Sequence, residues 1–318
     1  METTSKPGTN PAADGTITPC PIVVCTDNNY AQYVLPLFQS IVCNTRLDLA
    51  FFVIYSKLTE ENRNRIARIV RQGNSSHTIE FIEFDFFTWC RKTPFKPEDF
   101  RPFRNTKDCY DNYSRLFLSQ LFFRERGIRY LLYLDVDIVV NRCIDPLFTE
   151  TARIDLMGAV QDGDKLKNQE KGGKYINSGV LLLDLKAIDE FDFTHKALAY
   201  DQANRDHMKY FDQDIINGII PPDRLYMLDD IYNFQDNNPQ RLKDAVILHY
   251  TGTKPWNKNY MWRKKKCIWY TYHLASRLAL HGFVPGRATF LLINTAVTVV
   301  RPLLNIAKGI RKHLLPGA

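Results

Sequence analysis

The sequence predicts an α/β protein built on a parallel sheet with helices on both faces, and three observations support this class. Between residues 22 and 84, apolar runs of strand length alternate with segments of helical period, which is the pattern of consecutive βα units. The first run ends at the polar Asp27, and such sheets bind substrates at the carboxyl ends of their strands. A length of 318 residues, with 45% hydrophobic and 24% charged residues, is typical of one large folded domain with an appendage.

The predicted elements of the first third alternate as this fold requires. Ile22, Leu49 and Thr78 each begin a short run that reads as a strand. Apolar residues at helical spacing follow Tyr30, and a second helix opens at Thr59. In chain order, we expect a strand at 22–25, a helix at 30–42, a strand at 49–55, a helix at 59–72 and a strand at 78–84.

The rest of the predicted domain combines strands and helices with two polar loops. The strongest strand signal is the apolar run 130–140, which Asp135 and Asp137 interrupt. Pro and charged residues indicate a loop at 91–107, and polar residues indicate another at 161–174. The remaining expected elements are helices at 110–126, 186–205 and 213–219 and strands at 156–160, 175–185 and 245–250.

Charge divides the chain unevenly and indicates its organisation. The whole carries 42 Lys+Arg and 35 Asp+Glu, a net of +7. No acid follows Asp244, whereas 12 Lys+Arg do, so residues 1–244 carry a net charge of −5. We expect a disordered polar tail at 1–20, one globular domain at 21–258 and a basic helical region at 259–318.

The basic region predicts contact with an anionic surface, either a membrane or a nucleic acid. It begins with the basic run 263–266. Near its end, one helical face collects apolar residues and another collects basic ones, as in a helix that lies on an anionic leaflet. The alternative is a helix that packs on the protein body with a solvated basic face. The apolar face holds Leu303, Ile306, Ile310 and Leu314, and the polar face holds Arg301, Asn305, Lys308 and Lys312.

Cysteine usage and hydropathy bear on the compartment. The 7 cysteines show no CxxC spacing, so we expect neither a zinc ribbon nor a redox dithiol, and the odd, scattered set indicates free thiols in a reducing compartment. Residues 1–21 lack the apolar run of a signal peptide, and the apolar stretch 288–300 is too short and too polar to cross a bilayer. We therefore expect a cytoplasmic protein with a surface anchor.

Asp135 and Asp137 are the sharpest chemical signal. Alternate residues of a strand point to the same face, so the two carboxylates are expected side by side among apolar neighbours. A divalent cation removes the cost of burying like charges together. His249 ends another apolar run and offers an imidazole that suits Mn²⁺ beside carboxylates. The alternatives are two solvated acids at a strand end and a hydrogen-bonded structural histidine.

Other polar residues suit phosphate and sugar ligands. Gly252 permits close backbone approach and Lys254 offers a cation, as in a lid over a diphosphate, although a simple turn has the same composition. The clusters 177–179 and 212–214 contain Asn, Gln and Asp, which hydrogen-bond sugar hydroxyls, although Asp212 also suits a helix cap. Arg115 fits either a phosphate contact or a salt bridge.

The absence of GxGxxG, GxxxxGK[ST] and GxSxG removes the main support for dehydrogenases, P-loop NTPases and serine hydrolases.

In this order, the motifs resemble glycosyltransferase family 8, the retaining transferases of GT-A fold. The bacterial lipooligosaccharide and lipopolysaccharide galactosyl- and glucosyltransferases are the most similar branch. The resemblance covers about residues 22–256 and implies a Rossmann-like, mixed and mostly parallel sheet flanked by helices, in a nucleotide-sugar transferase domain. The motifs that carry it are DNNYA (27–31), YSRL (113–116), YLDVD (133–137), NSGV (177–180), DQDIIN (212–217) and HYTGTKPW (249–256).

The resemblance implies a role for each matched position. Asp135, Asp137 and His249 would bind Mn²⁺, with Mg²⁺ as the alternative, on the diphosphate of UDP-galactose or UDP-glucose. Gly252 and Lys254 would close over the phosphates. The uridine would contact Cys25, Asp27, Asn29, Tyr30 and the backbone of Val136, and the donor sugar would contact Arg115, Asp162, Asn177, Ser178, Gly179, Asp212 and Gln213.

A retaining transfer can proceed in two ways. Either an enzyme nucleophile attacks from the face opposite the leaving group, or the acceptor attacks from the same face that the leaving group occupies. Gln213 occupies the position that the resemblance implies on the far face of the anomeric carbon, but its amide oxygen is a weakly basic nucleophile. This favours same-face attack guided by the leaving phosphate. Asp212 or Asp214 as the nucleophile stays open.

The implied acceptor is a saccharide, such as that of a lipopolysaccharide or another glycolipid. Because a lipid-linked acceptor lies at a membrane, the membrane becomes the expected partner of the basic region, and the cytoplasmic face of the inner membrane the expected location. A basic nucleic-acid-binding protein without transferase activity is the alternative function, and it leaves the six motifs unexplained. An enzyme that makes sugar nucleotides would need a Gly-rich triphosphate loop, which the sequence lacks.

Overall fold

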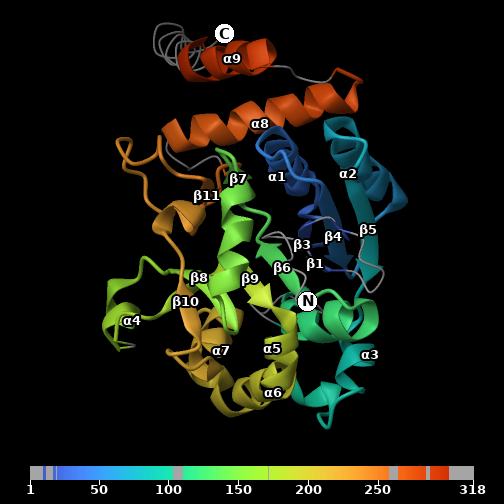
Figure 1. Ribbon diagram of the computed structural model, residues 1–318, viewed down its shortest axis with the longest axis vertical. Helices are drawn as coiled ribbons and strands as arrows, with labels where there is room; N and C mark the ends of the chain where they lie inside the picture. Colours follow the sequence, from blue (N-terminus) through green and yellow to red (C-terminus); the bar gives the residue numbers. More distant parts are fainter. Residues whose placement is uncertain are drawn as a thin grey trace, which may run out of the picture.

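The computed structural model describes residues 10–11, 17–18, 20–102, 110–170, 172–257, 264–283 and 287–300 (Figure 1). A seven-stranded sheet runs through its centre in the order β10-β8-β9-β6-β3-β4-β5. The strands of this sheet are β3 (Cys20–Thr26), β4 (Leu49–Tyr55), β5 (Thr78–Glu83), β6 (Tyr130–Leu134), β8 (Met157–Gln161), β9 (Ile176–Asp184) and β10 (Leu225–Met227). Near the N-terminus, β1 (Asn10–Pro11) and β2 (Ile17–Thr18) pair with each other.

The sheet is mixed and mostly parallel, which confirms the predicted fold class. β3 pairs in parallel with β4 and β6, β4 with β5, and β8 with β10. Among these seven strands, β9 alone runs antiparallel to its neighbours β6 and β8. The carboxyl ends of β3 and β6 therefore meet at one edge of the sheet, where the sequence places its polar motifs.

Helices cover both faces of this sheet (Figure 1). The α-helices are α1 (Ala31–Cys43), α2 (Glu60–Gly73), α3 (Phe86–Cys90), α4 (Lys165–Glu170), α5 (Leu185–Glu190), α6 (Phe193–Asn204), α7 (Asp212–Ile219), α8 (Lys264–Leu280) and α9 (Arg287–Thr295). Short 3-10 helices are η1 (Pro97–Asp99), η3 (Asp111–Phe117), η5 (Asp145–Arg153), η6 (Arg205–His207) and η7 (Asp230–Asn233), and π-helical segments are η4 (Ser119–Arg124) and η8 (Ala296–Val300).

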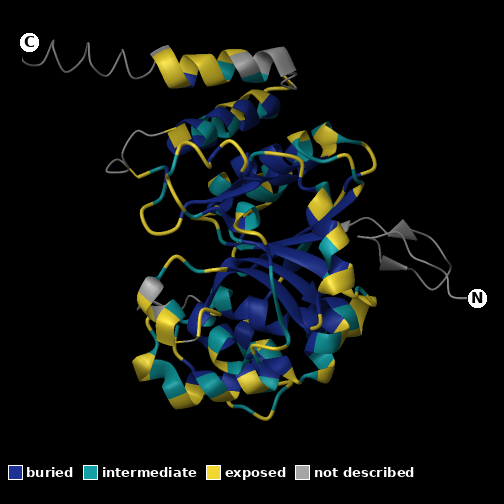
Figure 2. Ribbon diagram, turned by 60° about the vertical axis from the view of Figure 1, so that its left-hand side comes forward, coloured by how far each residue is buried: buried dark blue, intermediate teal, exposed yellow. Residues whose placement is uncertain are grey.

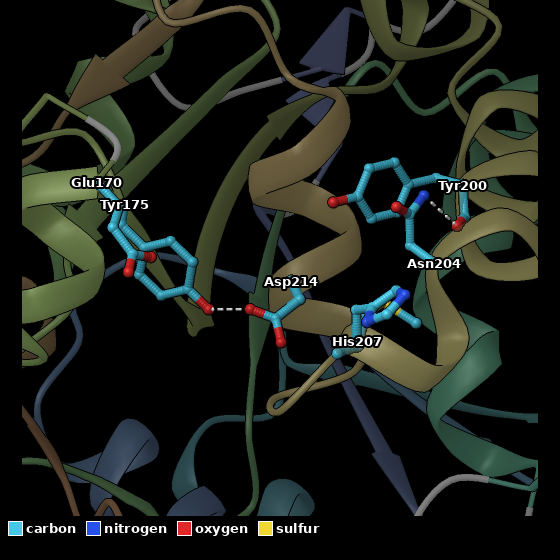
Figure 3. Close-up of a pocket in the computed structure, with 7 residues that line it drawn as sticks. Glu170, Tyr175, Tyr200, Asn204, His207 and Asp214 are labelled. Atoms are coloured by element: carbon cyan, nitrogen blue, oxygen red, sulfur yellow. Dashed lines mark hydrogen bonds between the residues drawn. The ribbon is translucent and has the colours of Figure 1, made fainter.

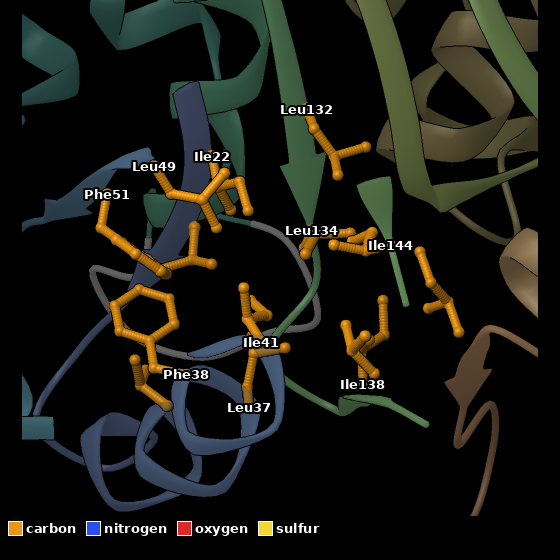
Figure 4. Close-up of a cluster of buried hydrophobic side chains, with 14 of the residues drawn as sticks. Ile22, Leu37, Phe38, Ile41, Leu49, Phe51, Leu132, Leu134, Ile138 and Ile144 are labelled. Carbon is orange, nitrogen blue, oxygen red and sulfur yellow. The ribbon is translucent and has the colours of Figure 1, made fainter. Parts of the chain in front are cut away.

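Buried apolar side chains form a layer on each face of the sheet. On the face that α1 covers, Phe38 packs against Phe51 with ring centroids 4.8 Å apart, and Ile22 lies in the same cluster (Figure 4). On the other face, Phe52 contacts Phe122 of η4 at 5.0 Å. Figure 2 shows this buried interior extending through the sheet. Because β4 faces a layer on each side, it is buried along its whole length, which explains its unbroken apolar sequence.

The prediction of a single strand at 130–140 is wrong. β6 ends at Leu134, residues 136–137 form a turn, and β7 (Ile138–Val140) pairs antiparallel with β11 (Ile247–His249) in a separate two-stranded sheet. Asp135 and Asp137 therefore occupy a turn and not alternate positions of a strand. A turn suits them because two carboxylates would be costly in the apolar layer that covers the sheet.

Three further predicted segments differ in detail. The polar loop at 161–174 contains α4, whose start Asp164 supports by accepting a hydrogen bond from the Leu166 amide at 3.1 Å. The predicted helix at 110–126 consists mainly of η3 and η4. The predicted helix at 186–205 is divided into α5 and α6, because Asp192 between them adopts a left-handed backbone conformation with φ of 59°.

The first helix of the basic region packs on the protein body. Helix α8 lies across the ends of α1 and α2 (Figure 1), and Gln72 of α2 donates a hydrogen bond to the carbonyl of Ala279 at 2.9 Å. Lys265 and Lys266 of the basic run are only 2% and 5% exposed, so they are not part of a solvated basic face. The amphipathic face predicted at 301–314, to which both the membrane prediction and its packed alternative refer, lies outside the described residues.

Among the residues that the structure describes, no helix combines the length and the apolar composition needed to cross a membrane.

Candidate active site

Asp135, Asp137 and His249 converge at the end of β6. The turn after β6 carries both aspartates, and the pairing of β11 with β7 sets His249 opposite Ile138. The imidazole Nε2 lies 3.3 Å from Asp137 Oδ1 and 4.0 Å from Asp135 Oδ2. One ligand atom from each residue lies within 4.8 Å of the others. The structure thus brings the three predicted metal ligands together, by a route that differs from the strand alternation we expected.

A chain of hydrogen bonds fixes which nitrogen of His249 faces the carboxylates. The backbone amide of Gly179 donates to Asn177 Oδ1 at 3.0 Å, which identifies that atom as the oxygen of the amide. Asn233 Nδ2 donates to the same oxygen at 2.9 Å, so Asn233 Oδ1 is the atom that lies 2.9 Å from His249 Nδ1. Nδ1 is therefore the ring nitrogen that donates to Asn233, and Nε2 is the atom that faces the two aspartates. A ligating histidine is held in this way in most metal sites.

Gly179 permits this convergence by lacking a side chain. A Cβ at this position would lie 2.3 Å from His249 Cε1 and 3.0 Å from Asp135 Oδ2. Its carbonyl also accepts a hydrogen bond from the Asp135 amide at 2.9 Å. The glycine of the NSGV motif is therefore required by close packing of β9 against the aspartate turn.

Arg115 connects the aspartate cluster to the start of α7. Its guanidinium lies 2.6 Å from Asp212 and 3.1 Å from Asp135, and it covers the ring of Tyr133 at 4.7 Å. The Tyr133 hydroxyl donates to Asp135 at 3.0 Å. Burial raises the pKa of Asp212, while the neighbouring Arg115 opposes that rise. The single arginine thus compensates two acids in a largely buried setting.

Gln213 lies at the centre of an amide network. Its Oε1 accepts hydrogen bonds from Asn177 Nδ2 at 3.1 Å and from the Ser178 amide at 3.2 Å. Its Nε2 donates to Asp162 at 3.2 Å, and Asn177 donates to the same carboxylate at 2.9 Å. The Ser178 hydroxyl donates to Asp212 at 3.1 Å. These contacts unite five of the seven predicted donor-sugar positions in one polar network.

Lys254 contacts the carboxylate of Asp137 and donates to the carbonyl of Tyr250 at 3.2 Å. Although burial alone raises the pKa of Asp137, His249 and Lys254 together hold it below its ordinary value. Gly252, two residues earlier, has a φ of +71°, which favours glycine. Two residues later, Trp256 stacks on Tyr33 at 3.7 Å, which ties this segment to α1.

The residues predicted to hold uridine lie at and after the end of β3. Asp27 accepts hydrogen bonds from the Tyr30 amide and from Asn29 Nδ2, both at 2.9 Å, and the Tyr30 ring is 43% exposed. Cys25 Sγ lies 2.8 Å from Ser114 Oγ, and burial raises the pKa of this thiol to about 11. Val136 lies in the aspartate turn. Their contact with a nucleotide stays a prediction.

Asp214 does not join the cluster. Its carboxylate accepts hydrogen bonds from the Tyr175 hydroxyl at 2.6 Å and from the amides of Lys209 and Tyr210 at 2.7 and 2.6 Å. It lines a cavity of about 120 Å³ that residues of α4, α6 and α7 help to enclose (Figure 3). The contacts show a carboxylate engaged in holding the backbone before α7.

Two residues of the site were not identified from the sequence. Asn233 orients His249, but it lies in a region without a readable motif. Tyr133 reads as an apolar strand residue, yet its hydroxyl contacts Asp135. The proximity of Asn233 to Asn177 depends on a contact across 56 residues of sequence, so no local pattern indicates it.

Comparisons with known proteins agree with this geometry. The model of the family described as "Glycosyl transferase family 8" matches residues 21–260. A lipopolysaccharide 1,2-glucosyltransferase of Escherichia coli K12 is 29% identical over 73% of this chain and 71% of its own. A putative glycosyltransferase of Haemophilus influenzae is 26% identical over 81% and 77%. The crystal structure of the galactosyltransferase LgtC with donor and acceptor sugar analogs has a TM-score of 0.62 at 23% identity, covering 86% of this chain and 99% of that one, and so shows the fold.

Proposed function

The chain belongs to glycosyl transferase family 8, and on that premise we propose that it is a retaining hexosyltransferase. It moves galactose or glucose from a UDP-sugar, with Mn²⁺, to the saccharide of a lipopolysaccharide or another glycolipid. The observation that carries this proposal is the convergence of Asp135, Asp137 and His249 beside the amide network of Gln213. The chain's similarity to a lipopolysaccharide glucosyltransferase and a galactosyltransferase supports the choice of hexose and acceptor.

The residues at the aspartate turn fit a divalent cation. Two carboxylates supply hard oxygen ligands, and the oriented Nε2 of His249 supplies a nitrogen that suits Mn²⁺ better than Mg²⁺. When bound, Mn²⁺ would offset the negative charge that develops on the diphosphate as the sugar leaves. Lys254, which contacts Asp137 in this structure, would add its own charge by exchanging that contact for a phosphate oxygen.

Around the diphosphate, the remaining predicted residues would hold the two ends of the donor. The segment from Cys25 to Tyr30 would bind uridine. The left-handed turn at Gly252 would bring Lys254, two residues later, close to the phosphates. The donor sugar would lie against the amide network described above, where Asn and Gln side chains offer both donors and acceptors to its hydroxyls. These residues would orient the anomeric carbon for transfer.

We favour attack on the same face of the sugar as the departing phosphate. Gln213 Oε1 already accepts two hydrogen bonds, and an amide oxygen is weakly basic, so it is poorly suited to attack. Both oxygens of Asp214 accept hydrogen bonds at a distance from the cluster. Asp212, the other candidate nucleophile, accepts a hydrogen bond from the Ser178 hydroxyl, and its carboxylate pairs with Arg115. A glycosylated protein detected by intact mass after incubation with the donor would contradict same-face attack.

UDP release from a panel of UDP-sugars in the presence of Mn²⁺ tests the proposal. We expect the fastest release from UDP-galactose or UDP-glucose, its loss on addition of EDTA and its return with excess Mn²⁺. Asp137→Asn should abolish release, whereas Asp155→Asn, in an exposed ion pair with Arg224, should not change it. Turnover that EDTA leaves unchanged would exclude the metal, and release from neither hexose donor would exclude the substrate class.

We further propose that the C-terminal region attaches the enzyme to the cytoplasmic face of the inner membrane. Exposed apolar side chains gather on and after α8 and α9, at Leu274, Leu278, Phe283, Leu292 and Val299. The sequence adds four bases and no acid from residue 301 onward. Apolar and basic residues in one region suit an anionic bilayer surface, whereas the burial of Lys265 and Lys266 leaves less free charge for a nucleic acid.

Sedimentation with vesicles tests this attachment. The full chain should bind phosphatidylglycerol vesicles, bind phosphatidylcholine vesicles much less, and dissociate at high salt. Leu292→Glu should weaken binding, whereas Leu166→Glu should not, because Leu166 is equally exposed but lies on α4. Equal binding by the two variants would show that the region around α9 does not contact the bilayer.

A further inference from the structure

Lys265 is a buried cation close to the candidate active site. It lies in the first turn of α8, beyond residue 260 where the match to the family ends, and it is 2% exposed. Its Nζ lies within hydrogen-bond distance of four backbone carbonyls, those of Phe234, Gln235, Asp236 and His249, at 3.0, 3.1, 3.2 and 2.7 Å, so its three N–H donors are shared among them. A buried ammonium is costly unless its hydrogens are accepted, and four converging carbonyls meet that need.

The four carbonyls belong to the two segments that build the histidine site. Phe234 directly follows Asn233, whose side chain fixes the Nδ1 proton of His249. The backbone of Phe234 is hydrogen-bonded to β11 on both sides, through Ile247 at 2.8 Å and His249 at 3.1 Å. The ammonium of Lys265 thus lies where the segment of Asn233 meets the segment of His249.

Helix α8 is held at this junction by further contacts. The Tyr250 hydroxyl donates to the carbonyl of Lys265 at 2.6 Å, so the residue after His249 returns a hydrogen bond to the helix. Trp269, one turn later, is 2% exposed and lies beside Trp256 with ring centroids 5.7 Å apart. The helix therefore cannot shift without moving the end of β11.

We propose that Lys265 is a positioning residue for His249. Because the carbonyls of both segments contact one ammonium, Lys265 sets the distance between Asn233 and the imidazole, and so the direction in which Nε2 points. Helix α8 then belongs to the working active site and not only to a membrane anchor. The proposal rests on the proposed function in one respect, namely that His249 ligates the metal.

Titration of the full chain with Mn²⁺ alone, followed by calorimetry, compares Lys265→Met with Lys264→Met. The two changes remove the same charge from neighbouring positions of one helix, but Lys264 is exposed. We expect Lys264→Met to bind like the wild type and Lys265→Met to bind about 10- to 100-fold more weakly, the usual effect of losing a group that orients a ligand. Equal affinities in both variants, with folding verified by circular dichroism, would overturn the proposal.

A second measurement needs no metal. In the wild type, ¹⁵N spectra of the histidine rings should show His249 fixed with its proton on Nδ1, assigned by comparison with His249→Ala. Lys265→Met should replace this signal with one averaged between tautomers, which a lysine that only stabilises the fold would not cause. If the wild type binds no Mn²⁺, the proposed function fails while the tautomer still decides the role of Lys265. Lys265→Gln serves both measurements if Lys265→Met does not fold.

Discussion

Gly179→Ala is expected to abolish Mn²⁺ binding and, with it, UDP release. The new methyl group would lie 2.3 Å from His249 Cε1 and 3.0 Å from Asp135 Oδ2, well inside van der Waals contact. The imidazole cannot yield easily, because Asn233 holds its Nδ1 and the ring is buried. Either His249 or the turn that carries the aspartates has to move. The three predicted metal ligands would then no longer lie close enough together to share one ion. We expect affinity to fall at least about 100-fold, the upper end for perturbed metal sites.

Gly163→Ala is the matched control for this substitution. A Cβ at Gly163 would approach only Gln235 Oε1, at 3.6 Å, which is ordinary contact. Both changes add one methyl group to a glycine whose backbone φ is not in the left-handed region. Calorimetry with Mn²⁺ and thermal melting should show Gly163→Ala close to the wild type in both. Wild-type Mn²⁺ affinity in Gly179→Ala would mean that the close approach does not matter for the site.

The regular part of the fold could be predicted because its signals are local. β3 and β4 are apolar runs of the right length, and the start of α2 carries Thr59, whose hydroxyl accepts from the Asn62 amide at 3.3 Å. The run 130–140 misled the prediction because apolar content does not distinguish one strand from two. Two acids in its middle were evidence for a turn, since a carboxylate is poorly tolerated in a covered sheet.

The residue types of the candidate site could be predicted from the sequence, but the hydrogen bonds that orient these residues could not. The six motifs supplied the residue types, and in the structure residues from most of these motifs contact one another. The contacts that orient them are long-range: Asn233 meets His249 across 16 residues, and Lys265 reaches Phe234 across 31. The burial of Lys265 and Lys266 could not be predicted either, because a lysine that donates to backbone carbonyls and one that faces solvent look alike in sequence.

Arg115→Met is expected to cost about 3–5 kcal/mol of unfolding free energy, the usual result of removing one member of a buried ion pair. Arg115 is only 9% exposed and it compensates both Asp212 and Asp135. Without it, Asp212 keeps its burial and loses the opposing charge. Arg224→Met removes an arginine from an exposed pair with Asp155, and it should cost no more than about 1 kcal/mol. Urea denaturation of the full chain measures both losses.

The loss caused by Arg115→Met should also depend on pH with a defined sign. Burial raises the pKa of Asp212 above its ordinary 3.8, and Arg115 opposes that rise, so removing Arg115 raises the pKa further. A carboxyl with a raised folded pKa binds its proton more tightly in the folded state. Stability is therefore greatest below the unfolded pKa and falls as the pH rises through the folded pKa. Arg115→Met should thus lose more stability at pH 7 than at pH 4.

Adding Asp212→Asn should remove most of this pH dependence and recover part of the stability, because an amide needs no counter-charge. A loss that is equal at both pH values would mean that the uncompensated carboxylate of Asp212 is not its cause.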